Sequence, residues 1–283
     1  MHTLSVTPTT RLGEPALHLQ STSGSEATVL LYGGHVVSFR PAQGPELLYL
    51  SPTATTANRS AVRGGVPVIF PQFDRRGPLA TVPRHGFART RPFEHVEGPQ
   101  DAVRLRLRDD DDSRRTFPYA FELTLQLSLT ADALTLDMEV LNRDEHPWAF
   151  TGALHTYLQV ADVETALVVG LQGHLYEDKV RDGATATGTT DPLQIRGEVD
   201  RIYAAVQAIE LQCPDRHVRI EQHGFTDAVI WNPGPTLAAG LADLPDDGYR
   251  EMLCIEAANA LSPVELPAGE QFHGQQRITL HRP

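Results

Sequence analysis

The segment from Arg59 to Arg91 concentrates positive charge in a chain that is otherwise acidic. It contains seven arginines and one acid, Asp74, whereas the whole chain of 283 residues has a formal net charge of -12. Glycines and prolines interrupt it throughout, so we expect irregular backbone of the kind that often carries binding sites on a rigid scaffold. The guanidinium group suits bidentate contact with phosphate or carboxylate. The segment therefore indicates either a pocket for a small anion or a surface where the arginines pair with acids.

Two histidines and two carboxylates are candidates for acid–base chemistry. His155 lies among apolar residues in TGALHTYLQV, and Glu256 lies in the apolar run EMLCIEA, where a glutamate is unusual unless it is paired or functional. His85 in PRHGFAR has arginine neighbours, whose charge favours its neutral form. Asp200 in GEVDRIY is explained equally well by a turn or an ion pair. A histidine and a glutamate in one pocket make a general acid–base pair, but the spacing equally allows packing roles for both histidines.

Metal and cofactor chemistry finds little support in the motifs. The chain has no zinc-type spacing of histidine or cysteine, no P-loop, no GxSxG and no dinucleotide-binding glycine motif. The acidic run 109–115 (DDDDSRR) lacks the glycine and the spacing of a calcium loop, so we expect a solvated turn. We therefore expect no metal and no cofactor.

Charge and cysteine content limit the partners and the compartment. The net charge of -12 argues against a nucleic-acid or anionic-membrane partner. Cys213 and Cys254 have no paired spacing and indicate buried, reduced thiols. The N-terminus does not resemble a signal peptide, and no apolar run reaches the roughly 18 residues of a membrane span. These features predict a cytoplasmic protein.

The elements that must position these residues are predicted from a period-two pattern of apolar residues. ELTLQLSL and ALTLDMEVLN alternate apolar and polar residues and are joined by a short polar turn, which predicts a β-hairpin with one buried face. Similar runs recur along the chain, as in AVRLRLRD, ATVLLY, ELLYL, WAFTGALHTYLQV and DAVIWN. Residues 200–211 fit a short helix or a strand. Long amphipathic helices are absent, so we predict an all-β fold, a large antiparallel β-sandwich or barrel in a single domain over residues 1–283.

Several segments together resemble the glucose-6-phosphate 1-epimerases, the hexose-6-phosphate mutarotase branch of the galactose mutarotase-like (aldose 1-epimerase) superfamily. They are RGGVPVIFPQF, PRHGFAR, ALHTYLQV, GLQGHLYEDKV, GEVDRIY, TDAVIWNP and DLPDDGYREMLCIEAAN. With a C-terminal strand, the resemblance extends over nearly the whole chain, from about residue 30 to 280. The resemblance implies a β-supersandwich fold. Two departures, WNPG in place of the frequent WNPW and EAANA after the glutamate strand, bear on sugar preference.

The resemblance also implies roles for particular residues. His155 and Glu256 match the catalytic pair of the family. The remaining matches are polar residues of the sugar site: Arg63, Arg84, His85, Arg89 and Asp200. Of these, the arginines are expected to hold a 6-phosphate. The implied partner is a small hexose 6-phosphate, and the fold is compatible with a monomer.

The implied activity is that of an isomerase that interconverts α and β anomers without a cofactor. Glu256 would act as the base on the anomeric hydroxyl and His155 as the acid on the ring oxygen. This assignment calls for an ionised glutamate and a protonated histidine, with Asp200 available to hold the histidine charged. A free-aldose 1-epimerase, a non-catalytic sugar-phosphate-binding protein and a glycoside hydrolase with two carboxylates are the alternatives.

Overall fold

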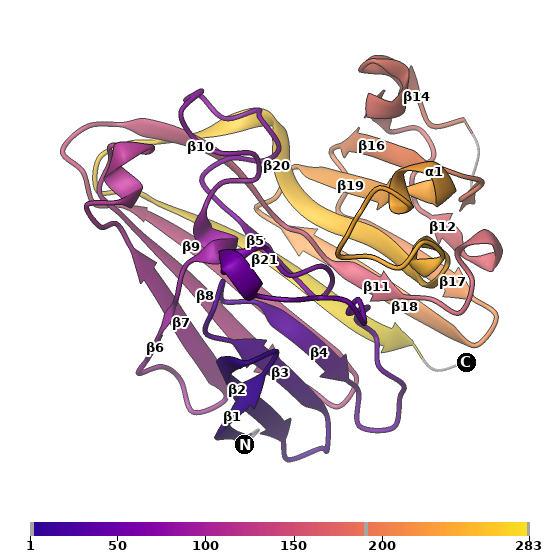
Figure 1. The fold of residues 1–283 in the computed structure, drawn as a ribbon, viewed down its shortest axis with the longest axis horizontal. Coiled ribbons are helices and arrows are strands. Elements are labelled where there is room, and N and C mark those ends of the chain that lie inside the picture. Colours follow the sequence, from indigo (N-terminus) through magenta and orange to yellow (C-terminus); the bar gives the residue numbers. More distant parts are fainter. Residues whose placement is uncertain (1–2, 190–191, 282–283) are drawn as a thin grey trace.

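Antiparallel sheets account for most of the computed structural model, which describes residues 3–189 and 192–281 (Figure 1). The first sheet contains β1 (Leu4–Arg11), β2 (Glu14–Ser21), β3 (Glu26–Leu30) and β4 (Val36–Arg40). The eight-stranded sheet has the order β14 (Ala184–Thr187), β13 (Leu175–Asp178), β16 (Val199–Ala204), β19 (Asp227–Asn232), β20 (Met252–Leu266), β10 (Trp148–Leu154) and β5 (Val68–Ile69), and β11 (Tyr157–Gln159) also pairs with β20. The nine-stranded sheet has the order β15 (Leu193–Gln194), β12 (Leu167–Val169), β17 (Ala208–Cys213), β18 (Arg216–His223), β21 (Gln271–His281), β9 (Ala133–Asn142), β8 (Phe121–Leu129), β7 (Ala102–Arg108) and β6 (Glu94–Val96).

Helical elements are short. They are the α-helix α1 (Gly234–Ala238) and the 3-10 turns η1 (Ala57–Arg59), η2 (Ala88–Thr90), η3 (Ser113–Arg115), η4 (Val163–Thr165), η5 (Lys179–Arg181) and η6 (Gly248–Glu251). Within the described part of the chain, none of these has the length and apolar character that a bilayer crossing requires. The prediction of an all-β, antiparallel β-sandwich is therefore confirmed.

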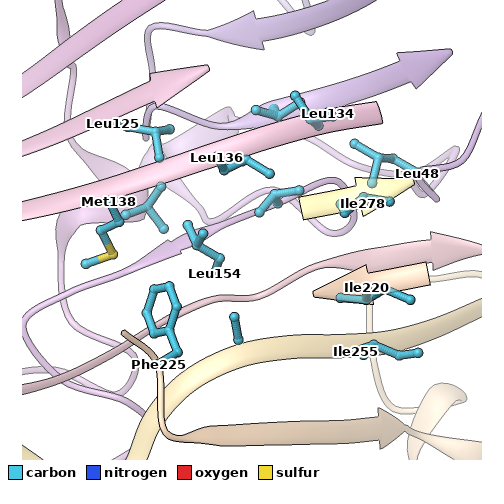
Figure 2. Packing of buried hydrophobic residues seen from close by; sticks show 14 of the residues in the cluster. Leu48, Leu125, Leu134, Leu136, Met138, Leu154, Ile220, Phe225, Ile255 and Ile278 are labelled. Carbon is cyan, nitrogen blue, oxygen red and sulfur yellow. The ribbon is translucent and has the colours of Figure 1, made fainter. Parts of the chain in front are cut away.

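The main core lies between the two larger sheets. Leu125 and Leu136 of the nine-stranded sheet belong to the same buried cluster as Leu154 and Ile255 of the eight-stranded sheet (Figure 2). The predicted hairpin is formed by β8 and β9, whose apolar side chains are almost fully buried and face each other across the ladder. The alternation of apolar and polar residues thus gives each of the two larger sheets one apolar face, and these faces pack together in the main core.

The structure decides one segment that the sequence left open, and it differs from the expected strands at two further places. Residues 200–211, left open as helix or strand, form the end of β16 and the start of β17. ELLYL makes only isolated bridges at Leu48 and Leu50, and the Glu46 carboxylate accepts backbone hydrogen bonds from Phe39 and Leu48. WAFTGALHTYLQV is divided into β10 and β11 by a break at His155.

The arginine-rich segment is irregular, as expected, and is anchored in the core by Phe70. The ring of Phe70 lies 5.0 to 6.4 Å from five other aromatic rings, those of Phe87, Phe117, Phe121, Trp148 and Phe150. Gly86 passes directly over this anchor at a φ of 66°, and a Cβ there would lie 2.1 Å from the Phe70 carbonyl oxygen. Only glycine fits this approach.

Candidate active site

Glu256 is placed by the alternation of side chains along β20. Leu253, Ile255 and Ala257 face the core between the sheets, so Glu256 projects from the opposite face. It is paired in register with Val229 of the neighbouring β19, which lines the same cavity. Figure 1 shows β20 as the long yellow strand beside β19. Although Glu256 is only 1% exposed, it faces a cavity rather than the main core.

His155 lies at the break between β10 and β11, opposite Glu256. Its backbone N–H donates to the carbonyl oxygen of Pro67 at 3.0 Å, which ties this break to the arginine-rich segment. The imidazole stacks on Tyr157, with ring centroids 4.9 Å apart and planes inclined by 10°. Its Nε2 lies 3.3 Å from Oε1 of Glu256. The two residues that are about 100 positions apart in sequence therefore meet in space.

These two side chains form part of the floor of a cavity of about 650 Å³. All seven predicted site residues line it. The full lining is Arg63, Phe73, Asp74, Arg75, Arg84, His85, Arg89, His155, Tyr157, Lys179, Glu198, Asp200, Val229, Trp231, Leu237, Leu241 and Glu256. The volume and the polar lining suit one small, hydrophilic, charged ligand.

The seven clustered arginines have different environments. Arg76 and Arg91 bind acids outside the cavity, Arg76 at Glu177 and Arg91 at two acids of the run 109–115. Arg59 lies in η1 and is not part of the lining. Four of the seven therefore reach the cavity.

Those four arginines are not equally placed to bind a ligand, and Arg75 is exposed to solvent in the irregular segment. Arg63 donates to Asp243 at 3.1 Å and to the Tyr157 hydroxyl at 3.0 Å. Arg84 is bound to Asp74 at 2.7 Å. Arg89 makes a 3.3 Å hydrogen bond to the Arg84 carbonyl oxygen, and among the described residues no carboxylate lies within 4.0 Å of its guanidinium group. Burial, together with the charges of Arg63 and Arg84, lowers the pKa of Arg89, so an anion bound there would relieve an unfavourable environment.

The acids on the other side of the cavity are joined by a lysine. Lys179, the single lysine of the chain, binds Asp74 at 2.8 Å and Asp200 at 3.1 Å. Asp74 accepts from Arg84 as well, so one network connects the irregular segment to β16. Burial raises the pKa of Asp200, and Lys179 opposes that effect. Asp200 is thereby held in a fixed position at the cavity wall.

Burial dominates the protonation of the histidines and the glutamate. The pKa of His85 falls to about 2, because the ring is desolvated and lies near Arg89 and Arg84, so it is neutral as expected. Its Nδ1 accepts from the backbone N–H of Asp74 at 3.3 Å, which leaves the ring proton on Nε2 as a donor. Burial lowers the pKa of His155 and raises that of Glu256.

The ionised pair expected from the sequence is therefore not the state that burial of the two side chains favours. A neutral imidazole and a protonated carboxyl group are favoured instead, because both charged forms are desolvated. The charge of Asp200 contributes to the raised pKa of Glu256. The pair still shares one proton over a distance of 3.3 Å.

Sequence reasoning missed several residues that line the cavity. Tyr157 follows His155 by two positions, a spacing that would have placed both on one face of a strand. Lys179 lies in GLQGHLYEDKV and Arg75 in the arginine-rich segment, but neither was singled out as a site residue. Gly234, at the position that made the WNPG departure notable, has a φ of 60° and begins α1, from which Leu237 reaches the lining.

Comparison with known proteins identifies the family. The family model described as aldose 1-epimerase matches residues 15–279. A relative from Escherichia coli K12, named "putative glucose-6-phosphate 1-epimerase", is 32% identical over 263 residues, which are 89% of this chain and 86% of that protein. A relative from Cenchrus ciliaris with the same name is 32% identical over 265 residues, 88% of this chain and 79% of that protein.

Solved structures agree with this result. The crystal structure of a "putative mutarotase" from Salmonella typhimurium matches with a TM-score of 0.87 and 27% identity over 99% of this chain and 94% of that one. Galactose 1-epimerase from Lactobacillus acidophilus has a TM-score of 0.77 at 14% identity over 99% of both chains, which is a likeness of fold alone. From the matched length and the identity to these relatives, this chain belongs to the aldose 1-epimerase family.

Proposed function

We propose that the protein is a hexose-6-phosphate mutarotase that interconverts the α and β anomers of glucose 6-phosphate. The observation that carries the proposal is the 3.3 Å contact between Nε2 of His155 and Oε1 of Glu256 in a cavity that also contains Arg89, which has no carboxylate partner within the described part of the chain. The names of the curated relatives favour the same substrate.

The short distance between the two groups fits the reaction. Glu256 takes the proton of the anomeric hydroxyl while His155 protonates the ring oxygen, and the C1–O5 bond breaks to give the open aldehyde. Both sugar oxygens are bonded to C1, so an acid and a base in contact with each other can reach them together. After rotation about C1–C2, the same two groups work in reverse and close the ring on the other face.

The protonation state that burial favours is also one of the two states of the pair in this reaction cycle. Ring opening leaves Glu256 protonated and His155 neutral, which is the state that burial favours. Starting from the cyclic sugar requires the proton on His155, a transfer within the pair. Lys179 and Arg89 lower the pKa of Glu256 and so favour its carboxylate form. The protein therefore passes between two forms of one neutral pair during the cycle.

The remaining lining residues select and orient the substrate. Arg89 is the principal phosphate ligand in this proposal, because Arg63 and Arg84 already bind Asp243 and Asp74, and Arg75 is more exposed to solvent than Arg89. Arg63 and Arg84 contribute from the sides. His85 donates from Nε2 to a sugar oxygen, and Asp200 accepts from sugar hydroxyl groups.

The test is the rate of anomer exchange measured by NMR saturation transfer at the two anomeric protons. Catalytic amounts of the protein should accelerate exchange of glucose 6-phosphate well beyond that of free glucose. Acceleration of free glucose alone would retain the acid–base pair and reject the phosphate pocket. Absence of acceleration with either sugar, together with tight binding of glucose 6-phosphate, would indicate a binding protein.

A further inference from the structure

A third side chain with a metal-ligand atom lies beside the proposed acid–base pair. Cys254 precedes Glu256 by two positions on β20, so both side chains project from the same face of the strand. One ligand atom from each of His155, Cys254 and Glu256 lies within 4.8 Å of the other two. The three residues are 8%, 0% and 1% exposed, respectively. Imidazole, thiol and carboxylate are the ligand types that bind Zn²⁺ in proteins.

Two atoms of this group are buried without a partner. Nδ1 of His155 and Oε2 of Glu256 make no hydrogen bond with any described residue. Buried polar atoms are normally paired; here no second hydrogen bond from a described residue holds either side chain away from an ion placed between Nε2 of His155 and Oε1 of Glu256, and Oε2 is available as a further carboxylate contact. His155 and Glu256 both line the cavity, which supplies a path of entry.

We propose that His155, Cys254 and Glu256 form an inhibitory binding site for Zn²⁺ or a similar divalent cation that prefers nitrogen and sulfur ligands. Nitrogen and oxygen ligands lie at roughly 2.0–2.2 Å from Zn²⁺, and two of them at a tetrahedral angle are separated by about 3.3 Å. The observed separation of Nε2 and Oε1 is 3.3 Å. The sulfur would move inward by at most about 1 Å to reach its usual distance. The fourth position opens to the cavity.

The charges of the ligands would neutralise the bound cation, although the cavity wall carries several arginines. Binding releases the thiol proton of Cys254 and the carboxyl proton of Glu256 to solvent, so the ligands contribute two negative charges to one divalent ion. The bound ion occupies the atoms that would reach the sugar. Inhibition competitive with the sugar therefore rests on the proposed function, whereas binding of the ion does not.

Co²⁺ is the probe for the ligand set, because a thiolate ligand gives an intense near-ultraviolet charge-transfer absorption. Titration of the whole protein should produce this absorption in the wild type and in Cys213→Ser, the matched control, since Cys213 is buried on β17 of the other large sheet. It should be absent in Cys254→Ser and in Cys254→Ala, and Zn²⁺ should displace it from the wild type. Absence from the wild type, or persistence in both Cys254 variants, would overturn the site.

Inhibition gives a second, separable measurement. Cys254 does not line the cavity, so Cys254→Ser should retain basal anomer exchange. The Zn²⁺ concentration for half-inhibition should rise at least tenfold in this variant and stay unchanged in Cys213→Ser. Equal inhibition of wild type and Cys254→Ser would overturn the three-ligand site. A protein that shows the Co²⁺ absorption but no exchange with any sugar would support the site and reject the proposed function.

Discussion

Replacement of Arg89 by alanine is the most direct test of the phosphate pocket. Arg89 binds no carboxylate among the described residues, so the substitution breaks no ion pair within the protein. Removal of Arg63 would take away the ion-pair partner of Asp243, and removal of Arg84 would take away one of the two cations that bind Asp74, the other being Lys179. A loss of binding in Arg89→Ala is therefore a loss of contact with the ligand, and it should depend on whether the ligand carries a phosphate.

The size of the effect follows from one charged contact. A hydrogen bond to a charged group contributes about 1.5–3 kcal/mol, and each 1.4 kcal/mol is about a tenfold change in affinity. Arg89→Ala should therefore raise KM for glucose 6-phosphate by about 10- to 100-fold. The KM for free glucose should change by less than about threefold, because free glucose lacks the charged group. Any change in kcat should be small beside the change in KM.

Saturation-transfer NMR at a series of sugar concentrations provides both constants. Arg201→Ala is the matched control, because Arg201 binds Asp178 at 3.1 Å outside the cavity and should leave both values of KM unchanged. Equal increases of KM for the phosphorylated and the free sugar would refute the assignment, since they would show that Arg89 supports the cavity wall and does not bind phosphate.

Three further predictions concern the acid–base pair and the core. Glu256→Gln and His155→Ala should each lower kcat by about 10²- to 10⁴-fold while circular dichroism shows a folded protein, and a variant that keeps most of its activity would remove that residue from the mechanism. Burial raises the pKa of Glu256 and lowers that of His155. The pair therefore takes up a second proton only below the lowered pKa of His155, and it loses its one proton only above the raised pKa of Glu256. The pH profile of kcat should thus stay level as the pH rises through about 6.5, the ordinary value for histidine, and an alkaline loss centred near 6.5 would indicate an ordinary histidine. Phe70→Ala should lower the free energy of unfolding by about 3–5 kcal/mol, measured by urea denaturation, whereas a loss below about 1 kcal/mol would show that the aromatic cluster is not an anchor.

The sequence was sufficient for the fold and for seven of the residues that line the cavity, but not for their protonation and ion pairing. Alternation in β8 and β9 predicts the buried face because a strand has only two faces. His155 and Glu256 could be selected by residue type and resemblance. Their contact depends on the pairing of β20 with both β10 and β11, which no local pattern encodes.

Protonation and ion pairing were the features that sequence reasoning did not predict. The neutral form of the pair follows from burial of both side chains, a property of the whole cavity. Likewise, Arg63, Arg84 and Arg89 are equivalent in a list of arginines. They differ in space because Asp243 lies beside the first and Asp74 beside the second. Long-range partners of this kind are fixed by tertiary structure, not by spacing.

The proposed catalytic glutamate lies on a regular strand, whereas the arginines proposed to select the substrate lie on irregular backbone. These two kinds of backbone differ in how readily they tolerate changes of sequence. Glu256 is held within a 15-residue strand that has neighbours on both sides. The cationic wall instead belongs to the irregular segment fixed at Phe70 and Gly86, with residues 74–84 looping out between these two points. Exchange of that loop between relatives would alter charge and shape at the rim while β20 remains in place. Such an architecture allows a lineage to acquire a new sugar preference by loop replacement, and it offers the same route to protein engineering.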